Sequence, residues 1–136
     1  MTSRIYESEP RERLDLLALV LDTLDQSECG RLAFLRIERE MFDETGTTPE
    51  HTDGFINYAR SIRGVEVATQ LMETGDDQWK VSFRSRGKVD VSELAVRFDG
   101  GGHHNAAGCQ MTGSPAEVEA RLSDALVDIL DTSAVD

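Results

Sequence analysis

The sequence predicts an α/β fold in which a mixed sheet of four or five strands is flanked by two longer and two shorter helices. Apolar residues recur at helical spacing near both ends of the chain, and strand-like runs lie between them. Capping and turn residues separate these segments. The 136 residues are enough for one domain with a buried core.

The N-terminal segment is amphipathic and predicts a helix over about residues 8–27 that ends near Gly30. Its expected apolar stripe comprises Leu14, Leu17, Ala18, Leu21 and Leu24. Residues 32–37 are mostly apolar and predict a buried strand. A polar connection over 39–50 follows, with a helical turn from Arg39 to Phe42.

The middle of the chain predicts a helix and then a hairpin. Phe55, Ala59 and Ile62 share a helical face, with Thr52 or Asp53 as the expected N-cap and Gly64 as the stop. Strands are expected over 65–73 and 78–86, joined by a four-residue loop at 74–77. Apolar and polar residues alternate in the second strand, so Arg84 points away from the face that carries Trp79 and Phe83, and Trp79 belongs to the core.

Two capping boxes organise the C-terminal part. Asp90 and Glu93 predict a short helix that reaches Phe98, and Ser114 and Glu117 predict a long final helix. Residues 106–111 predict a strand of small residues between them. The expected organisation is an N-terminal helix over 1–30, the main domain over 31–131 and a frayed tail over 132–136.

Composition limits the function. A net charge of −12 excludes a long nucleic-acid track, because such binding relies on basic residues that release phosphate counterions. Four basic residues, Arg84, Arg86, Lys88 and Arg97, nevertheless lie close together in the sequence. They fit either a local phosphate site or a solvated strand edge that resists sheet pairing.

The sequence contains no apolar run long enough for a membrane span and no signal-peptide core near its start, which indicates a cytoplasmic protein without a membrane partner. Cys29 and Cys109 lie 80 residues apart without a second cysteine nearby, so neither a disulfide framework nor a zinc site is expected. Both thiols are expected to be buried or inert.

Residues 100–108 carry the strongest functional signal, with three glycines followed by two histidines and further small residues. Glycine lets backbone approach a ligand closely, and successive amides can form an anion-binding concavity. His103 adds a titratable donor. The alternative interpretation of the run is a flexible turn.

Three segments together, residues 54–68, residues 81–85 and the glycine run with Ala106, Ala107 and Gly108, resemble the DHHA1 domain, the C-terminal substrate-binding domain of DHH-family phosphoesterases. The similarity is greatest to the branch that hydrolyses very short oligonucleotides and 3′-phosphoadenosine 5′-phosphate (pAp). It covers nearly the whole chain. The resemblance implies that pAp, a short oligonucleotide or a similar nucleotide is the ligand, and that an N-terminal DHH domain is the partner.

The resemblance also implies which residues bind the substrate. The Gly100, Gly101 and Gly102 amides and His103 would cradle a phosphate, and Arg84 would add a bidentate contact. Secondary candidates are Ser85, His104, Asn105, Asn57 and Arg60. Their structural alternatives are a turn hydroxyl, solvent-facing polar groups and, for the helix residues, exposed helical positions.

Two departures from the family pattern stand out. The Asp-His-His signature that holds two divalent cations, usually manganese, in the catalytic domain is absent, because His103-His104 follows glycine. The resemblance therefore implies a C-terminal fragment with no catalytic residue, metal or cofactor of its own, inactive alone. Asp99 stands where the family usually has another glycine, and its carboxylate would repel phosphate unless it turns away or pairs with Arg97.

Two further hypotheses stay open on the sequence. One is a non-catalytic module for tRNA binding or dimerisation, as in related domains of alanyl-tRNA synthetases, although the net charge of −12 counts against tRNA. The other is a standalone hydrolase that uses its own histidines. Release of phosphate from pAp in the presence of manganese would distinguish this last hypothesis from the others.

Overall fold

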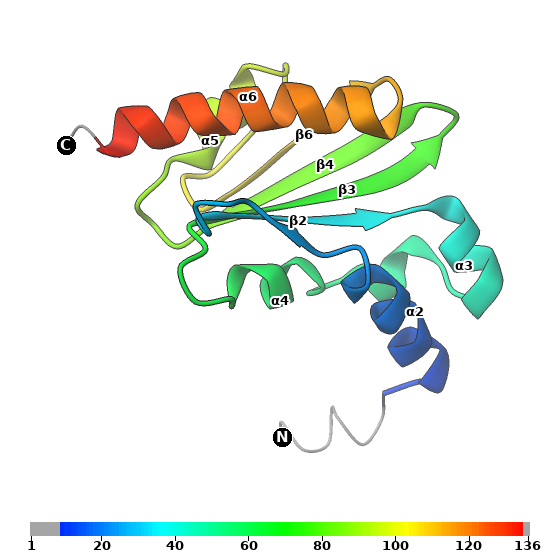
Figure 1. Cartoon of the computed structure of the whole chain (residues 1–136). Coiled ribbons are helices and arrows are strands. Elements are labelled where there is room, and N and C mark those ends of the chain that lie inside the picture. Colours follow the sequence, from blue (N-terminus) through cyan, green and yellow to red (C-terminus); the bar gives the residue numbers. More distant parts are fainter. Residues whose placement is uncertain (1–8, 135–136) are drawn as a thin grey trace.

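The computed structural model describes residues 9–134, which form a six-stranded mixed sheet with helices on both faces (Figure 1). The strand order is β1-β2-β3-β4-β6-β5. Four strands are long: β2 (Leu32–Ile37), β3 (Val67–Gly75), β4 (Gln78–Ser85) and β6 (Ala106–Thr112). The edge strands β1 (Asp25–Gln26) and β5 (Gly101–Gly102) have two residues each. The predicted mixed α/β sheet is confirmed, with these short edge strands bringing the total to six.

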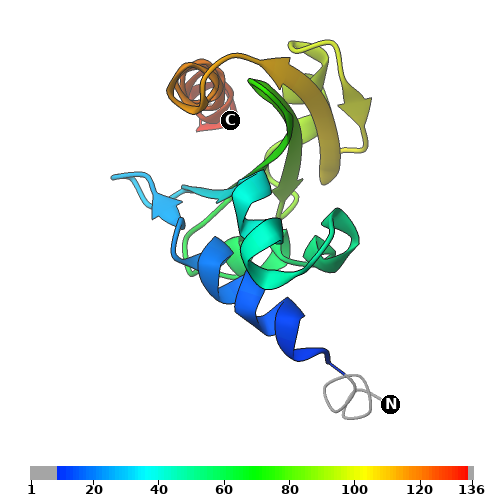
Figure 2. The same ribbon diagram turned by 90° about the vertical axis from the view of Figure 1, so that its right-hand side faces the viewer.

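Strands β2 and β3 are parallel, and every other neighbouring pair is antiparallel. The connection from β2 to β3 carries α3 (Arg39–Thr45), the 3₁₀ helix η1 (Pro49–Thr52) and α4 (Ile56–Arg60). These elements lie with α2 (Arg11–Leu21) on one face of the sheet (Figure 1). Helices α5 (Val91–Val96) and α6 (Pro115–Ala134) lie on the other face, as the view in Figure 2 shows.

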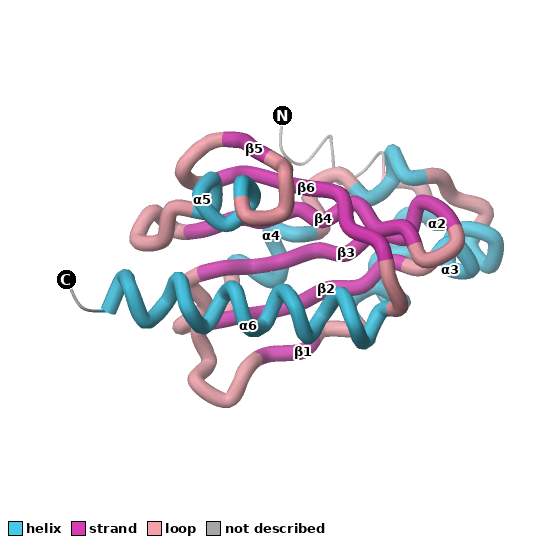
Figure 3. Tube along the Cα trace, turned by 90° about the horizontal axis from the view of Figure 1, so that it is seen from above, coloured by secondary structure: helices cyan, strands magenta, loops and turns pink. Residues whose placement is uncertain are grey.

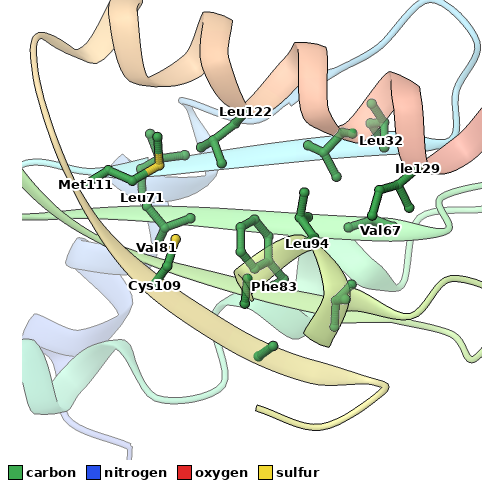
Figure 4. Close-up of a cluster of buried hydrophobic side chains, with 14 of the residues drawn as sticks. Leu32, Val67, Leu71, Val81, Phe83, Leu94, Cys109, Met111, Leu122 and Ile129 are labelled. Carbon is green, nitrogen blue, oxygen red and sulfur yellow. The ribbon is translucent and has the colours of Figure 1, made fainter. Parts of the chain in front are cut away.

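The larger core lies between the sheet and α5 and α6 (Figure 4). Alternate residues of β3 and β4, including Leu71, Val81 and Phe83, face Leu94 of α5 and Leu122 of α6. Trp79 belongs to this core, as expected, because it is 2% exposed and its indole N–H donates to the Gly113 carbonyl at 3.0 Å. A second core joins α2, α3 and α4 to the opposite face of β2 and β3.

Helix cover is uneven on that second face. Helix α4 packs against β2, β3 and β4, whereas β6 and β5 lie at the far edge of the sheet (Figure 3). On the α4 side of the outer strands, Lys80 and Gln110 are exposed, and Ser82, Arg84 and Gly108 are half-buried. The uncovered strip along β4 and β6 is where the fold leaves polar side chains in reach of a ligand.

The opening helix is shorter than expected and turns a different stripe inward. Helix α2 ends at Leu21 because Thr23 then leaves the helix, donating to the Val20 carbonyl and accepting from the Arg36 amide of β2. Residues 25–26 form β1 instead of helix. The buried residues are Leu16, Leu17 and Val20, whereas Leu14 and Leu24 are 48% and 38% exposed. Of the predicted stripe, Leu17 is buried and Leu21 is half-buried, whereas the other three residues are exposed, so the predicted stripe was wrong for those three. Residue 8, the predicted start of the helix, lies outside the described residues.

Local boundaries differ elsewhere too. The helical turn expected at Arg39–Phe42 extends to Thr45. Neither Thr52 nor Asp53 caps α4, which begins after Phe55 without a side-chain cap; Thr52 instead donates to the Pro49 carbonyl within η1. That helix ends at Arg60, before the expected stop at Gly64, which has a φ of 89° in the following turn.

The hairpin between β3 and β4 is tighter than the predicted four-residue loop. Gly75 pairs with Gln78, and the register shifts between Glu73 and Gly75, so the turn contains only Asp76 and Asp77. Asp77 has a φ of 53°, a left-handed conformation that aspartate tolerates. At the C-terminus, α6 continues to Ala134, past the expected start of a tail at residue 132, and residues 135–136 lie outside the described residues.

Both predicted caps form, but only the one at α6 is a complete capping box, because no hydrogen bond joins the Glu93 side chain to the Asp90 amide. The Asp90 carboxylate accepts from the Ser92 amide at 2.9 Å and begins α5, which ends at Val96 before a turn that contains the half-buried Phe98. At the start of α6, Ser114 and Glu117 bond each other's backbone amides, both at 3.2 Å. These two helices fix the segment between them, which contains β5 and β6.

Candidate functional site

Two neighbouring hollows lie on the uncovered face and share Lys80 and Ser82; together we call them the groove. One hollow, of about 380 Å³, lies between β3, β4 and the η1–α4 segment and reaches Arg84. The other, of about 490 Å³, extends across β6 to Asp99 and Gly100. The groove therefore connects the two segments that the sequence singles out, the strand with Arg84 and the glycine run.

A single row of residues crosses the floor of the groove. Gln70 of β3 pairs with Ser82 of β4, Ser82 pairs with Gly108 of β6, and Gly108 pairs with Gly101 of β5. Residues directly opposite one another in a sheet share a face. With strands about 4.8 Å apart, the row from Gln70 to Gly101 spans about 14 Å.

Two cations flank this row. Lys80 and Arg84 lie two residues before and after Ser82 on β4, so all three side chains point to the same face. Neither cation forms an ion pair with any residue in the described range 9–134, and the Arg84 guanidinium donates only to the Phe83 carbonyl, at 3.0 Å. Positive charge without a carboxylate partner is what a phosphate-binding surface requires.

The other members of the basic cluster do not join Arg84. Arg86 donates to the Arg60 carbonyl at 3.1 and 3.0 Å, and Arg97 forms an ion pair with Asp128 at 2.7 Å. Lys88 is exposed on the loop after β4. Proximity in the sequence therefore does not produce one basic patch.

The three glycines have different roles. A Cβ on Gly100 would lie 2.1 Å from the Gly108 carbonyl oxygen, and one on Gly102 would lie 2.5 Å from the Ala107 Cα. Both positions need glycine because β5 and the preceding turn approach β6 closely. A Cβ on Gly101 would meet no atom within 4 Å, so only this glycine leaves open space at the end of the groove.

The amides of the run are not all available to a ligand. The Gly100 amide donates to the Ala95 carbonyl at 2.8 Å. His103 and Ala106 exchange two backbone hydrogen bonds, so the next pair, Gly102 and Ala107, is a non-hydrogen-bonded pair. The Gly102 amide therefore points away from β6, at the free edge of the sheet, and is the amide of the three that can meet an anion.

The two histidines also differ. The His103 imidazole is exposed and forms no hydrogen bond with the described residues, so it can donate to a ligand. The His104 ring instead makes a 2.7 Å hydrogen bond to the Gly87 carbonyl, and its Nδ1 lies 3.6 Å from the Asp90 carboxylate. His104 thus ties the turn after β5 to the loop before α5.

Ser85 and Asn105 belong to the same loop anchor. Ser85 is 1% exposed, and its hydroxyl donates to the Val89 carbonyl at 2.8 Å and contacts the Asn105 side chain at 3.4 Å. The Asn105 carbonyl accepts from the Ser85 amide at 2.9 Å. These residues hold the loop and the glycine turn together and do not present their bonded groups to the groove.

The two helix candidates are divided between the groove and another hollow. Asn57 lines a separate hollow between α2 and α4. In this hollow the Arg13 guanidinium donates hydrogen bonds to the Glu9 carboxylate and to two backbone carbonyls. Arg60 is half-buried and lies one helical turn after Ile56, which lines the groove. Neither Asn57 nor Arg60 lines the groove itself.

The donor set does not fit a metal centre. Within residues 9–134, no group of three or more His, Cys, Asp or Glu side chains could hold a metal ion. The His104 ring bonds to the Gly87 carbonyl, the His103 ring forms no hydrogen bond with the described residues, and the His51 ring bonds to Thr48 at the start of η1. No reaction step through a metal is derived from these residues.

Residues 30–132 match the DHHA1 domain. The chain belongs to the DHHA1 domain family. Proteins named bifunctional oligoribonuclease and PAP phosphatase NrnA, from Bacillus subtilis and Thermus thermophilus, are 28% and 34% identical to it. The alignments cover 80% and 83% of this chain but only 34% and 33% of the relatives, so this DHHA1 domain spans about a third of their length.

A solved structure agrees with this assignment. An exopolyphosphatase-related protein from Bacteroides fragilis superimposes with a TM-score of 0.86 at 27% identity, over 96% of this chain and 38% of that one. The DHHA1 domain described here is thus related to NrnA phosphoesterases in sequence and to an exopolyphosphatase-related protein in fold. None of the helices in its described part is both long and apolar enough to cross a membrane.

Many residues that line the groove were not among the predicted ligand contacts, and Lys80, Gln70 and Gly108 are three of them. Lys80 could have been found, because it alternates with Ser82 and Arg84 on the polar face of the same predicted strand. Gln70 and Gly108 could not, because their position depends on which strands are neighbours and in which register. Strand order is a property of the whole fold that single-sequence periodicity does not contain.

Proposed function

We propose that this DHHA1 domain binds the phosphate of a small nucleotide, pAp or a short oligonucleotide, in the groove. The observation that carries the proposal is the pair of cations, Lys80 and Arg84, that lack a carboxylate partner among the described residues of a chain with net charge −12. Arg84 presents a planar fork suited to phosphate oxygens, and Lys80 supplies a mobile point charge. His103 and the Gly102 amide would add donors from the glycine turn.

The shape of the groove supports a small ligand. Its two hollows are of about 380 and 490 Å³, within the range of small-molecule sites, and its floor ends at Gly101 where no side chain intrudes. A long nucleic-acid track would need a continuous basic surface, whereas Arg86 and Arg97 are engaged with other groups of the protein. The proposed ligand is therefore a nucleotide of one to a few units.

We propose that binding and hydrolysis belong to separate domains, because the described residues contain no cluster of metal-binding side chains. This domain would hold the nucleotide, and a separate DHH domain with divalent cations, manganese in the family, would carry out hydrolysis. The names of the NrnA relatives support the substrate class, since they describe action on oligoribonucleotides and PAP. On this proposal, the chain incubated with pAp and Mn²⁺ releases no phosphate.

Titration of the full chain with pAp, followed through backbone amide NMR shifts, tests the binding proposal. We expect shifts at Gly101, Gly102, His103 and Arg84, and an Arg84→Gln variant should weaken binding by about tenfold or more. Arg11→Gln is the matched control, because Arg11 lies on α2, outside the groove, and its ion-pair partner among residues 9–134 is Asp15. Unchanged shifts at millimolar pAp, or equal affinity of both variants and the wild type, would contradict the proposal.

A further inference from the structure

The amide of Gln70 is a buried polar group that the fold leaves without a partner. Gln70 is 7% exposed, and its Oε1 is buried with no hydrogen bond among the described residues. A buried acceptor without a donor destabilises a protein relative to a paired one, because its lost hydration is not replaced. Such a group is unusual enough to require an explanation.

The position of Gln70 points to a ligand. Its side chain lines the hollow between β3, β4 and the η1–α4 segment, at the opposite end of the floor row from Gly101. The χ3 torsion of glutamine, which sets the orientation of the amide, has a broad distribution of preferred angles. A rotation about it therefore turns the amide oxygen or the NH₂ group toward the hollow. A ligand in the hollow would supply the partner that the protein lacks.

The surroundings of this hollow suit a nucleobase. Ile56 and Met72 contribute apolar surface, and Glu50 and Asp53 place carboxylates at its rim. Carboxylates repel phosphate but accept hydrogen bonds from amino groups, so the part of the hollow beside Glu50 and Asp53 favours the base, whereas Lys80 and Arg84 in the same hollow favour phosphate. The distance of about 14 Å along the floor row gives room for one nucleotide.

The Gln70 amide can distinguish purines on one edge of the base. It carries one acceptor and one donor side by side, which matches N6–H and N7 of adenine in a bidentate pair. On the same edge, hypoxanthine presents two acceptors, O6 and N7, and so leaves Oε1 without a donor. Uracil has no N7 and therefore lacks this edge.

We propose that the hollow at Gln70 is an adenine subsite, in which the Gln70 amide pairs with the base while Arg84 holds a phosphate of the same nucleotide. This inference rests on the proposed function, because it places the base of the ligand whose phosphate the groove binds. It assigns the specificity of the domain to β3 and the η1–α4 segment, outside both the glycine run and the strand that carries Arg84.

The test compares two ligands that differ only in the base, 3′,5′-adenosine bisphosphate and 3′,5′-inosine bisphosphate, by calorimetric titration of the full chain. We expect the wild type to bind the adenosine ligand about tenfold more tightly. A Gln70→Met variant keeps the size of the side chain and removes the amide, so it should bind both ligands with equal affinity. Its thermal stability should equal or exceed that of the wild type, because the unpaired acceptor is gone.

Thr69→Val is the matched control. Thr69 is fully buried, its hydroxyl also lacks a partner among the described residues, and it lies on the opposite face of β3 from Gln70. The substitution removes a second unpaired buried group without touching the groove. We expect it to retain the full preference for the adenosine ligand.

The outcomes separate the two proposals. If both ligands bind the wild type equally, or if Gln70→Met keeps the preference, the adenine subsite is wrong while phosphate binding stands. An Arg84→Gln variant should weaken both ligands by the same factor and leave the preference intact. If neither ligand binds the wild type, the proposed function is wrong and the adenine subsite is wrong with it.

Discussion

Arg97 on the turn after α5 forms an ion pair with Asp128 of α6, with 2.7 Å between Nη1 and Oδ2. The sequence left open whether Arg97 would neutralise Asp99, and this pairing directs the guanidinium elsewhere. Asp99 has no ion-pair partner among residues 9–134, is exposed, and lines the β5-side hollow of the groove. Its φ of 62° places it in the left-handed region, which glycine adopts without strain. The carboxylate therefore adds negative charge to the hollow that shares Lys80 with the proposed phosphate site.

Removal of the Asp99 charge should strengthen phosphate binding. Asparagine tolerates left-handed backbone as aspartate does, so Asp99→Asn changes the charge and keeps the conformation. We expect about two- to fivefold tighter binding of pAp at about 50 mM salt, with a smaller gain at about 300 mM salt because of screening. Asp124→Asn on α6 is the charge-matched control, since α6 lies on the opposite face of the sheet. Equal gains from both variants would show that only the net charge matters.

Alanine substitutions should separate the structural glycines from the ligand-facing one. Gly100→Ala drives a methyl group into the Gly108 carbonyl, and we expect a loss of about 1–3 kcal/mol or more in the free energy of unfolding. Gly101→Ala meets open space, and Gly101 has a negative φ, so its stability should stay within about 0.5 kcal/mol of the wild type. The same variant should weaken pAp binding, because its methyl group lies on the floor of the groove. Urea unfolding and calorimetric titration measure the two effects, and a stable Gly100→Ala variant would contradict the close approach of β6.

The sequence was sufficient where local chemistry decides the structure. Period-two alternation placed Trp79 in the core and Arg84 on the opposite face, and cap residues located the starts of α5 and α6. These features depend on residues within a few positions of one another. Local patterns therefore predicted which face of β4 is polar. That polar face is the main part of the candidate site.

The errors arose where contacts from distant parts of the chain compete with local pattern. Thr23 ends α2 because it bonds to Arg36 on β2, 13 residues away in the sequence. The glycine run carried the strongest signal, yet Gly100 and Gly102 are required chiefly by the contact of β5 with β6. His104 was predicted as a secondary ligand candidate, and the sequence did not show that the fold places Gly87 and Asp90 beside its ring. Each case depends on contacts between distant segments that the sequence does not specify.

The Asp90 cap should make stability depend on pH in one direction. The hydrogen bond from the Ser92 hydroxyl holds the pKa of the Asp90 carboxyl below its ordinary value, with further lowering by the Ser92 amide and the charge of His104. A lowered folded-state pKa means that the carboxylate stabilises the fold above the unfolded value of about 3.9, and that this contribution is lost as pH falls through the folded-state pKa.

We therefore expect Asp90→Ala to lower the free energy of unfolding by about 1 kcal/mol at pH 7 through loss of the N-cap. The difference in the free energy of unfolding between this variant and the wild type should narrow as the pH is lowered below the unfolded-state pKa of the Asp90 carboxyl. Asp90→Asn keeps a capping oxygen and should stay close to the wild type at pH 7. Urea unfolding of the three proteins at a series of pH values gives the comparison, and a difference that widens in acid would contradict the assigned cap.

The two cysteines should differ sharply in reactivity. Cys109 is 7% exposed, and burial raises the pKa of its thiol to about 11, as expected for an inert residue. Cys29 is exposed, so burial is confirmed for Cys109 alone; a hydrogen bond with Ser27, followed by one with the Arg31 backbone, lowers the pKa of the Cys29 thiol. Because the thiolate is the nucleophile, iodoacetamide at about pH 7.5 should modify native protein at Cys29 alone, with Cys109 on the order of a hundredfold slower. Mass spectrometry of peptides should show that both cysteines are modified in urea. In native Cys29→Ser protein, we expect no modification. Rapid alkylation of Cys109 in the native state would contradict its place in the core.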